Sequence, residues 1–225
     1  MEDTSAQRLR RKPRSDGERS RRTILDAAAK LATVDGLEGL SIGRLADHIG
    51  MSKSGLYAHF GSKEDLQLAA IETASAIFDA EVIAPADQKT TPLEKIEMLC
   101  EQFLSHVERR VFPGGCFFAS AAAEFDTHPG AVRERIAEFQ RGWTDLLVQL
   151  VRDAQAAGQL RTEDPDQLVF ELNGYLIMAN MAFLLYGSNQ PIDRAREAVA
   201  ARLRRSRPAE LGLKAHPHSL PRSRR

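Results

Sequence analysis

Apolar residues in this chain recur at intervals of three and four positions, and no stretch alternates apolar with polar residues as a half-exposed strand does. The pattern therefore predicts an all-α protein. Glycine, proline and Ser/Thr cap residues divide the pattern into about nine helices. The expected ranges are 20–34, 42–49, 53–60, 62–83, 91–112, 116–125, 131–157, 164–187 and 191–205.

Charge and composition suggest how these helices are grouped into domains. The expected parts are a flexible basic arm (1–18), a three-helix unit (19–66), a helical bundle (67–205) and a disordered basic tail (206–225). The 31 basic and 31 acidic residues cancel overall, but residues 67–201 hold 11 basic and 20 acidic residues. A polyanion could therefore meet the two ends of the chain, whereas the middle would repel it.

Residues 41–60 have the spacing of a helix-turn-helix, with a short helix on either side of Gly50-Met51-Ser52. Ala46 is small where two helices must cross closely, and Gly50 can adopt the positive φ of a turn. The second helix keeps a polar outer face, which fits the major groove of DNA. A plain helical hairpin that binds nothing is the alternative. Basic residues suited to phosphates favour DNA binding: Arg8, Arg10, Arg11, Lys12, Arg14, Arg19, Arg21 and Arg22.

The same region resembles the DNA-binding domain of the tetracycline-repressor (TetR) family. The matching segments are Thr23–Ala28, Gly36, Leu45-Ala46, Gly50-Met51-Ser52, Leu56–Phe60 and Ser62–Leu66. The resemblance covers residues 20–70, and the rest of the chain matches the family only in length and helical plan. It implies a homodimeric, ligand-responsive regulator, a repressor that a small molecule releases from a palindromic double-stranded operator.

The resemblance also implies which residues contact DNA. Ser41 and Arg44 would lie near a phosphate or a base, and the start of the second helix would face bases. Gly55 departs from the family pattern, which commonly has a polar residue there, so one base contact is left open. The predicted contacts are Arg22, Ser41, Arg44, Ser52, Lys53, Ser54, Gly55, Tyr57, His59 and Lys63.

The helix expected at 164–187 is apolar nearly all round, so both of its sides must be covered. A second copy of the chain, with helix 191–205 beside it, is the simplest cover, and burial within one chain is the alternative. The predicted dimer interface consists of Leu168, Leu172, Tyr175, Leu176, Ala179, Phe183, Ala195 and Val199.

A ligand pocket is expected where polar or aromatic side chains interrupt the apolar runs of the bundle, because buried polar groups need partners. A structural hydrogen bond is the alternative role for each of them. The candidates are His106, Phe117, Glu124, Trp143, Asn173, Met178 and Asn180. The ligand would be small and mainly apolar, with few polar groups.

Other chemistry finds little support in the sequence. Glu124, Asp126 and His128 have a possible metal-ligand spacing, but Pro129 interrupts it, so no metal or cofactor is expected. Cys116 is expected to be a buried hydrophobe rather than a redox thiol. No nucleophile, zinc or phosphate-binding motif appears, so an enzyme is not expected.

The apolar run 168–186 raises the question of a membrane helix. Glu171, Asn173 and Asn180 interrupt it, and its length is at the short edge for a span, so a soluble, cytoplasmic protein is expected. Two rival functions stay open: a helical enzyme or carrier for an apolar molecule without DNA binding, and a protein–protein adaptor that uses the same helical hairpin.

Overall fold

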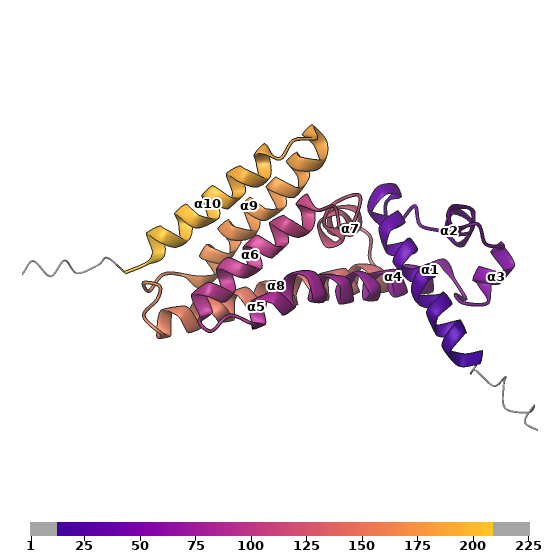
Figure 1. The fold of residues 1–225 in the computed structure, drawn as a ribbon, viewed down its shortest axis with the longest axis horizontal. Coiled ribbons are helices and arrows are strands. Elements are labelled where there is room, and N and C mark those ends of the chain that lie inside the picture. Colours follow the sequence, from indigo (N-terminus) through magenta and orange to yellow (C-terminus); the bar gives the residue numbers. More distant parts are fainter. Residues whose placement is uncertain (1–12, 209–225) are drawn as a thin grey trace, which may run out of the picture.

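The computed structural model describes residues 13–208, which are helical apart from short turns (Figure 1). The all-α prediction is confirmed for these residues. Most of the predicted arm and tail, at 1–12 and 209–225, lies outside them. The helices are α1 (Pro13–Asp35), α2 (Ile42–Ile49), α3 (Lys53–Tyr57), α4 (Lys63–Phe78), α5 (Ala84–Asp87), α6 (Pro92–Glu108), α7 (Phe117–Phe125), α8 (Ala131–Ala156), α9 (Pro165–Tyr186) and α10 (Gln190–Ser206).

The predicted boundaries of the flexible arm (1–18) and of the disordered tail (206–225) are wrong. Helix α1 begins at Pro13, so residues 13–18 are helical rather than part of a flexible arm. Proline suits the first position of a helix, where its missing N–H would have no partner. At the other end α10 includes Ser206, which is buried and whose carbonyl accepts a hydrogen bond from Arg161 N (2.7 Å).

The sequence predicts that the fourth helix ends at residue 83, before Pro85. In the structure the helical run continues past this proline. A π-helical turn, Asp79–Ile83, joins α4 to α5 without a break, and Ala84 N bonds to Asp79 O. The wider turn accommodates the proline inside the helix. Counting this run as one helix, the described residues form nine continuous helical segments, and the gap predicted between the helices 62–83 and 91–112 shrinks to a few residues.

Helices α1, α2 and α3 form a small unit at one end of the molecule, here called the head (Figure 1). Its core includes Ala28, Leu40 and Leu45, all with no exposed side-chain surface. Helix α4 packs on α1 and then runs from the head into the remaining helices, the bundle. The boundary predicted at residue 66 therefore falls inside one rigid helix, so α4 mechanically couples the head to the bundle.

Helix α9 lies in the bundle against α6, α8 and α10. Among the described helices it is the one long and apolar enough to cross a membrane by length and composition, although 44% of its most apolar window is buried in the subunit. Arg202 of α10 is nearly buried and pairs with Glu163 (2.9 Å) and with Glu171 of α9. These contacts fix α10 to α9 and leave the opposite face of α9 open.

Candidate DNA-binding surface and regulatory pocket

The turn between α2 and α3 has the helix-turn-helix geometry that its sequence predicts. Ser41 Oγ caps α2 by accepting from Arg44 N (3.2 Å), and Ser52 Oγ caps α3 by accepting from Gly55 N (3.1 Å). Gly50 ends α2 at φ +69°, where a side chain would be strained. Leu56 on the inner side of α3 is fully buried. Caps and core thus fix the orientation of the short helix α3.

The outer face of α3 is exposed. Lys53, Ser54 and Tyr57 project to solvent, and Tyr57 keeps 60% of its surface exposed. The predicted contacts Gly55 and His59 are only partly exposed. A Cβ at Gly55 would lie 3.1 Å from Ser52 Oγ, so glycine here leaves room for the cap. The capping hydroxyl of Ser41 accepts from the backbone, which leaves its own proton available to a phosphate oxygen, whereas Ser52 Oγ also shares a hydrogen bond with Ser54 Oγ (3.3 Å).

Two predicted phosphate ligands are already paired within the subunit. Arg44 lies 2.9 Å from Asp35, and Lys63 lies 2.7 Å from Glu38. The hydrogen bond from Lys63 holds the pKa of Glu38 below its ordinary value. Exposed pairs of this kind contribute little to stability, so phosphates can compete for both cations at small cost.

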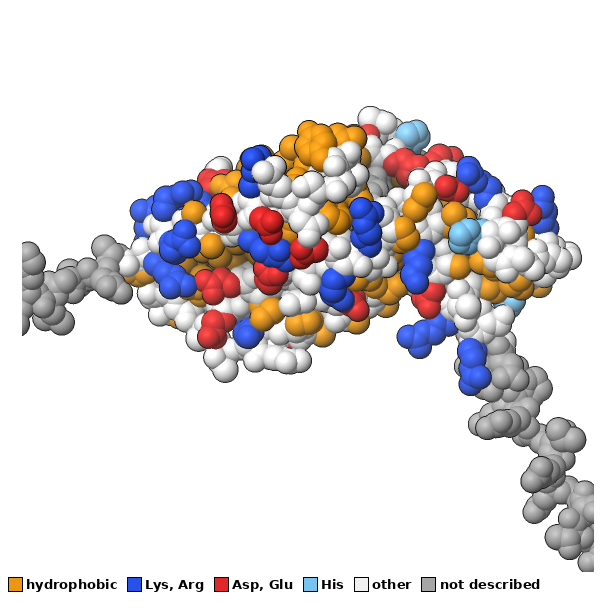
Figure 2. Space-filling view, turned by 45° about the horizontal axis from the view of Figure 1, so that its top comes forward, with side chains coloured by type: hydrophobic (Ala, Val, Ile, Leu, Met, Phe, Trp, Pro, Cys, Tyr) orange, Lys and Arg blue, Asp and Glu red, His pale blue; other side chains and the backbone are white. Residues whose placement is uncertain are grey.

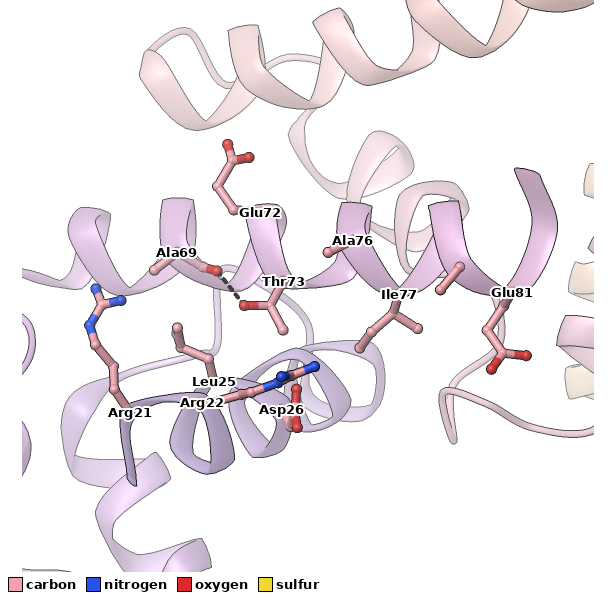
Figure 3. Close-up of a pocket in the computed structure, with 11 residues that line it drawn as sticks. Arg21, Arg22, Leu25, Asp26, Ala69, Glu72, Thr73, Ala76, Ile77 and Glu81 are labelled. Carbon is pink, nitrogen blue, oxygen red and sulfur yellow. Dashed lines mark hydrogen bonds between the residues drawn. The ribbon is translucent and has the colours of Figure 1, made fainter. Parts of the chain in front are cut away.

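The remaining predicted contact, Arg22, lies on a groove between α1 and α4 (Figure 3). The groove has a volume of about 730 Å³ and opens widely to solvent. Arg21 and Arg22 come from α1, Glu72 from α4 and Glu81 from the π-helical turn, and the carboxylate of Glu72 points away from α1 and pairs with Arg135 (Figure 3). Its wide opening and mixed charge do not suit a small apolar ligand.

A more enclosed pocket of 340 Å³ lies inside the bundle, between α4, α6, α7, α8 and α9. Trp143 Nε1 donates to Asn173 Oδ1 (2.8 Å), and Gln140 Nε2 donates to the Phe118 carbonyl (3.2 Å). None of the lining residues carries a formal charge. They are Phe78, Phe103, Cys116, Phe118, Ala119, Ala122, Ala123, Phe139, Gln140, Trp143, Asn173, Leu176 and Ile177.

The structure separates the predicted ligand residues into groups. Trp143 and Asn173 line this pocket together. Phe117 is buried in the core, and Asn180 accepts a hydrogen bond from Cys116 N (2.9 Å). Met178 is exposed on the surface of α9. Glu124 lies against the head.

His106 lies fully buried among aromatic rings, and its ring packs edge-on against Phe78 of the pocket wall. Neither ring nitrogen has a hydrogen-bond partner in the described structure. Burial lowers the pKa of His106 to about 4; nearby Glu81 raises it slightly, and Arg109 lowers it. The side chain is therefore neutral at pH 7.

Sequence reasoning missed most of the pocket wall, including Phe118, Phe139 and Gln140. The signal available was the concentration of phenylalanine after residue 60, which does not distinguish core from cavity. Cys116 also lines the pocket, and burial raises the pKa of its thiol to about 11. A thiol with so high a pKa is a poor nucleophile, in agreement with its predicted role as a buried hydrophobe.

Most of the residues predicted for the dimer interface face the interior of a single subunit. Tyr175 is half-buried against the core. The other members keep at most 6% of their surface exposed within a single subunit, so they offer little surface to a second copy, although Ala179 and Ala195 line a groove between α9 and α10. These buried residues are Leu168, Leu172, Leu176, Ala179, Phe183, Ala195 and Val199.

The opposite side of α9 exposes large apolar side chains instead, here called the apolar stripe. Its members recur at helical spacing: Phe170, Ile177, Met178, Met181, Leu185 and Tyr186. Beside Met178 and Tyr186, a groove of 460 Å³ runs between α9 and α10. Figure 2 shows hydrophobic side chains gathered at the top of the bundle, where α9 and α10 meet. Contiguous exposed apolar surface of this kind marks an interaction site.

Comparison with known proteins agrees with this architecture. Residues 24–70 match the family model of bacterial regulatory proteins, tetR family, and residues 92–199 match that of the tetracyclin repressor-like C-terminal domain. Transcriptional regulator AcuR of Cereibacter sphaeroides is 26% identical over 156 residues, which are 68% of this chain and 71% of that protein.

Solved structures show the same fold. A TetR transcriptional regulator from Chloroflexus aurantiacus J-10-fl has a TM-score of 0.79 and 27% identity, covering 85% of this chain and 98% of the other. AibR, solved in complex with isovaleryl coenzyme A and operator DNA, has a TM-score of 0.66 and 23% identity, covering 80% and 96%. One family model matches the helix-turn-helix head and the other matches the bundle that follows it. This chain therefore belongs to the TetR family and is a DNA-binding transcriptional regulator.

Proposed function

We propose that this protein represses transcription in the bacterial cytoplasm by binding a palindromic operator as a homodimer, and that a small uncharged ligand releases it. The observation that carries the proposal is the exposed polar face of α3, held in place by the Ser52 cap and the buried Leu56. Such a helix presents its N-terminal residues to base edges in the major groove.

We call α3 the reading helix, because its outer face would contact the bases. A palindromic operator has two half-sites, and a homodimer supplies a reading helix for each of them. The apolar stripe on α9 supports this assembly, because a two-fold axis can place the same stripe of two subunits face to face. The side chains that meet there would be those of the stripe, not the buried set predicted from the sequence.

The chemistry of the pocket supports an uncharged ligand. Five aromatic rings and four small side chains surround a space whose polar groups are the amides of Gln140 and Asn173. AibR binds isovaleryl coenzyme A. The pocket described here has no Lys or Arg in its lining for phosphate groups, so we propose a neutral, mainly apolar molecule.

Substitutions on the reading helix test DNA binding. We expect Lys53→Ala to weaken binding to DNA fragments that the wild type selects from genomic DNA by about tenfold, and to lower the salt dependence by about one counterion. Tyr57→Ala should weaken binding comparably. Arg141→Ala, which removes an exposed charge of the bundle, is the control. Wild-type affinity in both α3 variants, measured by fluorescence anisotropy, would contradict the assignment.

Trp143 is the single tryptophan of the chain, so its fluorescence reports on the pocket. We expect benzamide to quench this emission at concentrations at least about tenfold lower than benzoate, because burying an unpaired carboxylate costs far more than burying an amide. Titration of both probes at pH 7 measures the difference. Tighter binding of benzoate would refute an uncharged ligand.

A further inference from the structure

Glu124, near the end of α7, reaches across to the head. Its carboxylate accepts hydrogen bonds from Leu37 N (2.8 Å) and Glu38 N (2.9 Å), in the turn between α1 and α2. Gly36 before them has φ +82°, and a Cβ there would lie 2.7 Å from Glu124 Oε1. Glycine therefore lets two successive backbone N–H groups form an anion-binding concavity around the carboxylate.

The turn that Glu124 holds is part of the support of the reading helix. Gln67 of α4 donates to the Leu37 carbonyl (2.8 Å), and Leu37 itself is buried in the head. Glu38 pairs with Lys63 at the start of α4 (2.7 Å). A shift of the turn relative to α7 therefore changes how the head sits on α4.

The same helix forms one wall of the pocket. Phe118, Ala119, Ala122 and Ala123 of α7 line the 340 Å³ space, and Ala123 directly precedes Glu124. An occupant that presses on this wall displaces the residues next to the carboxylate. A nine-residue helix transmits such a displacement as a nearly rigid body.

The beginning of α7 is tied as firmly as its end. Gly114 N donates to Thr33 Oγ1 of α1 (3.1 Å), and a Cβ at Gly114 would collide with the Thr33 carbonyl. Cys116 N donates to Asn180 Oδ1 of α9 (2.9 Å). Helix α7 thus connects the head, the pocket and the helix that carries the apolar stripe.

We infer that Glu124 is the positioning residue through which occupancy of the pocket changes the orientation of the head. This inference rests on the proposed function, since it assigns the route by which a ligand would weaken operator binding. The carboxylate is outside the lining of the pocket and acts through the Leu37 and Glu38 amides. Without it, the end of α7 loses its hydrogen bonds to the head, and the bond between Gly114 and Thr33 before the beginning of α7 remains.

A double-mutant cycle tests the inference without a known ligand. Ala119→Leu fills part of the pocket and imitates an occupant. We expect it to weaken operator binding by about fivefold or more when Glu124 is present, and by less than about twofold in the Glu124→Gln background. A residue that served stability alone would leave the effect of Ala119→Leu equal in both backgrounds. Ala119→Val replaces Ala119→Leu if the larger side chain prevents folding.

Two control experiments separate the role of Glu124 from a general effect of charge and from DNA binding itself. Asp126→Asn removes a neighbouring exposed negative charge and should keep the full effect of Ala119→Leu. Amide exchange of Leu37 and Glu38, followed by NMR without DNA, should become faster in Glu124→Gln and in Ala119→Leu.

The results that would contradict the role of Glu124 differ from the result that would contradict the proposed function. Equal effects of Ala119→Leu in both backgrounds, or no effect on operator affinity and amide exchange with Glu124 present, overturn the role of Glu124. Failure of the wild type to bind any DNA fragment overturns the proposed function, while the exchange measurement still judges the connection through α7.

Discussion

Met181→Glu should convert the proposed homodimer into a monomer. Met181 lies in the middle of the apolar stripe, with 49% of its surface exposed, and two copies related by a two-fold axis would bring two carboxylates into an apolar interface. Burying such charges without partners costs several kcal/mol. Operator affinity should then fall by about 100-fold or more, because two linked reading heads bind far more tightly than one.

Mass measurement by light scattering and operator titration together check this expectation. Val34→Glu is the matched control: Val34 is also an exposed apolar residue (63%), but it lies on α1 and outside the stripe. It should remain dimeric. A Met181→Glu variant that stays dimeric at micromolar concentration would show that the subunits associate through another surface.

His106→Leu should raise the stability of the protein, and the gain should grow as the pH falls. The neutral imidazole is buried with two unpartnered nitrogens, a cost of about 1–3 kcal/mol that leucine removes. The pKa of His106 is lowered from 6.5 to about 4, so the unfolded chain binds a proton that the folded chain does not. The loss of stability that His106 causes is therefore absent above pH 6.5 and grows as the pH falls toward 4, to about 3 kcal/mol.

Urea unfolding at pH 7 and pH 4.5 measures this contribution at one fixed protein concentration. The difference in free energy of unfolding between His106→Leu and wild type should be larger at pH 4.5. His48→Gln, which changes an exposed histidine of α2 and keeps His106, should lose stability with pH as the wild type does. A difference that does not depend on pH would mean that the folded protein protonates His106 as readily as the unfolded chain does.

Local sequence determined the helices and the reading head of this protein. The caps Ser41, Ser52 and Ser62 and the glycine at position 50 act within a few residues of their own position, so their effect can be read without the fold. The family resemblance of the head rests on the same local pattern, and the matches to residues 24–70 and 92–199 confirm the family.

Tertiary structure alone decided which side of α9 faces outward and what Glu124 contacts. A helix that is apolar nearly all round carries no local signal for its buried side; the packing of α6, α8 and α10 covers Leu172 and Leu176 and leaves Met181 exposed. Glu124 meets Leu37 across 87 positions of sequence, and the phenylalanines of the pocket wall come from four different helices. Such contacts depend on how the helices pack against one another, which local periodicity does not specify.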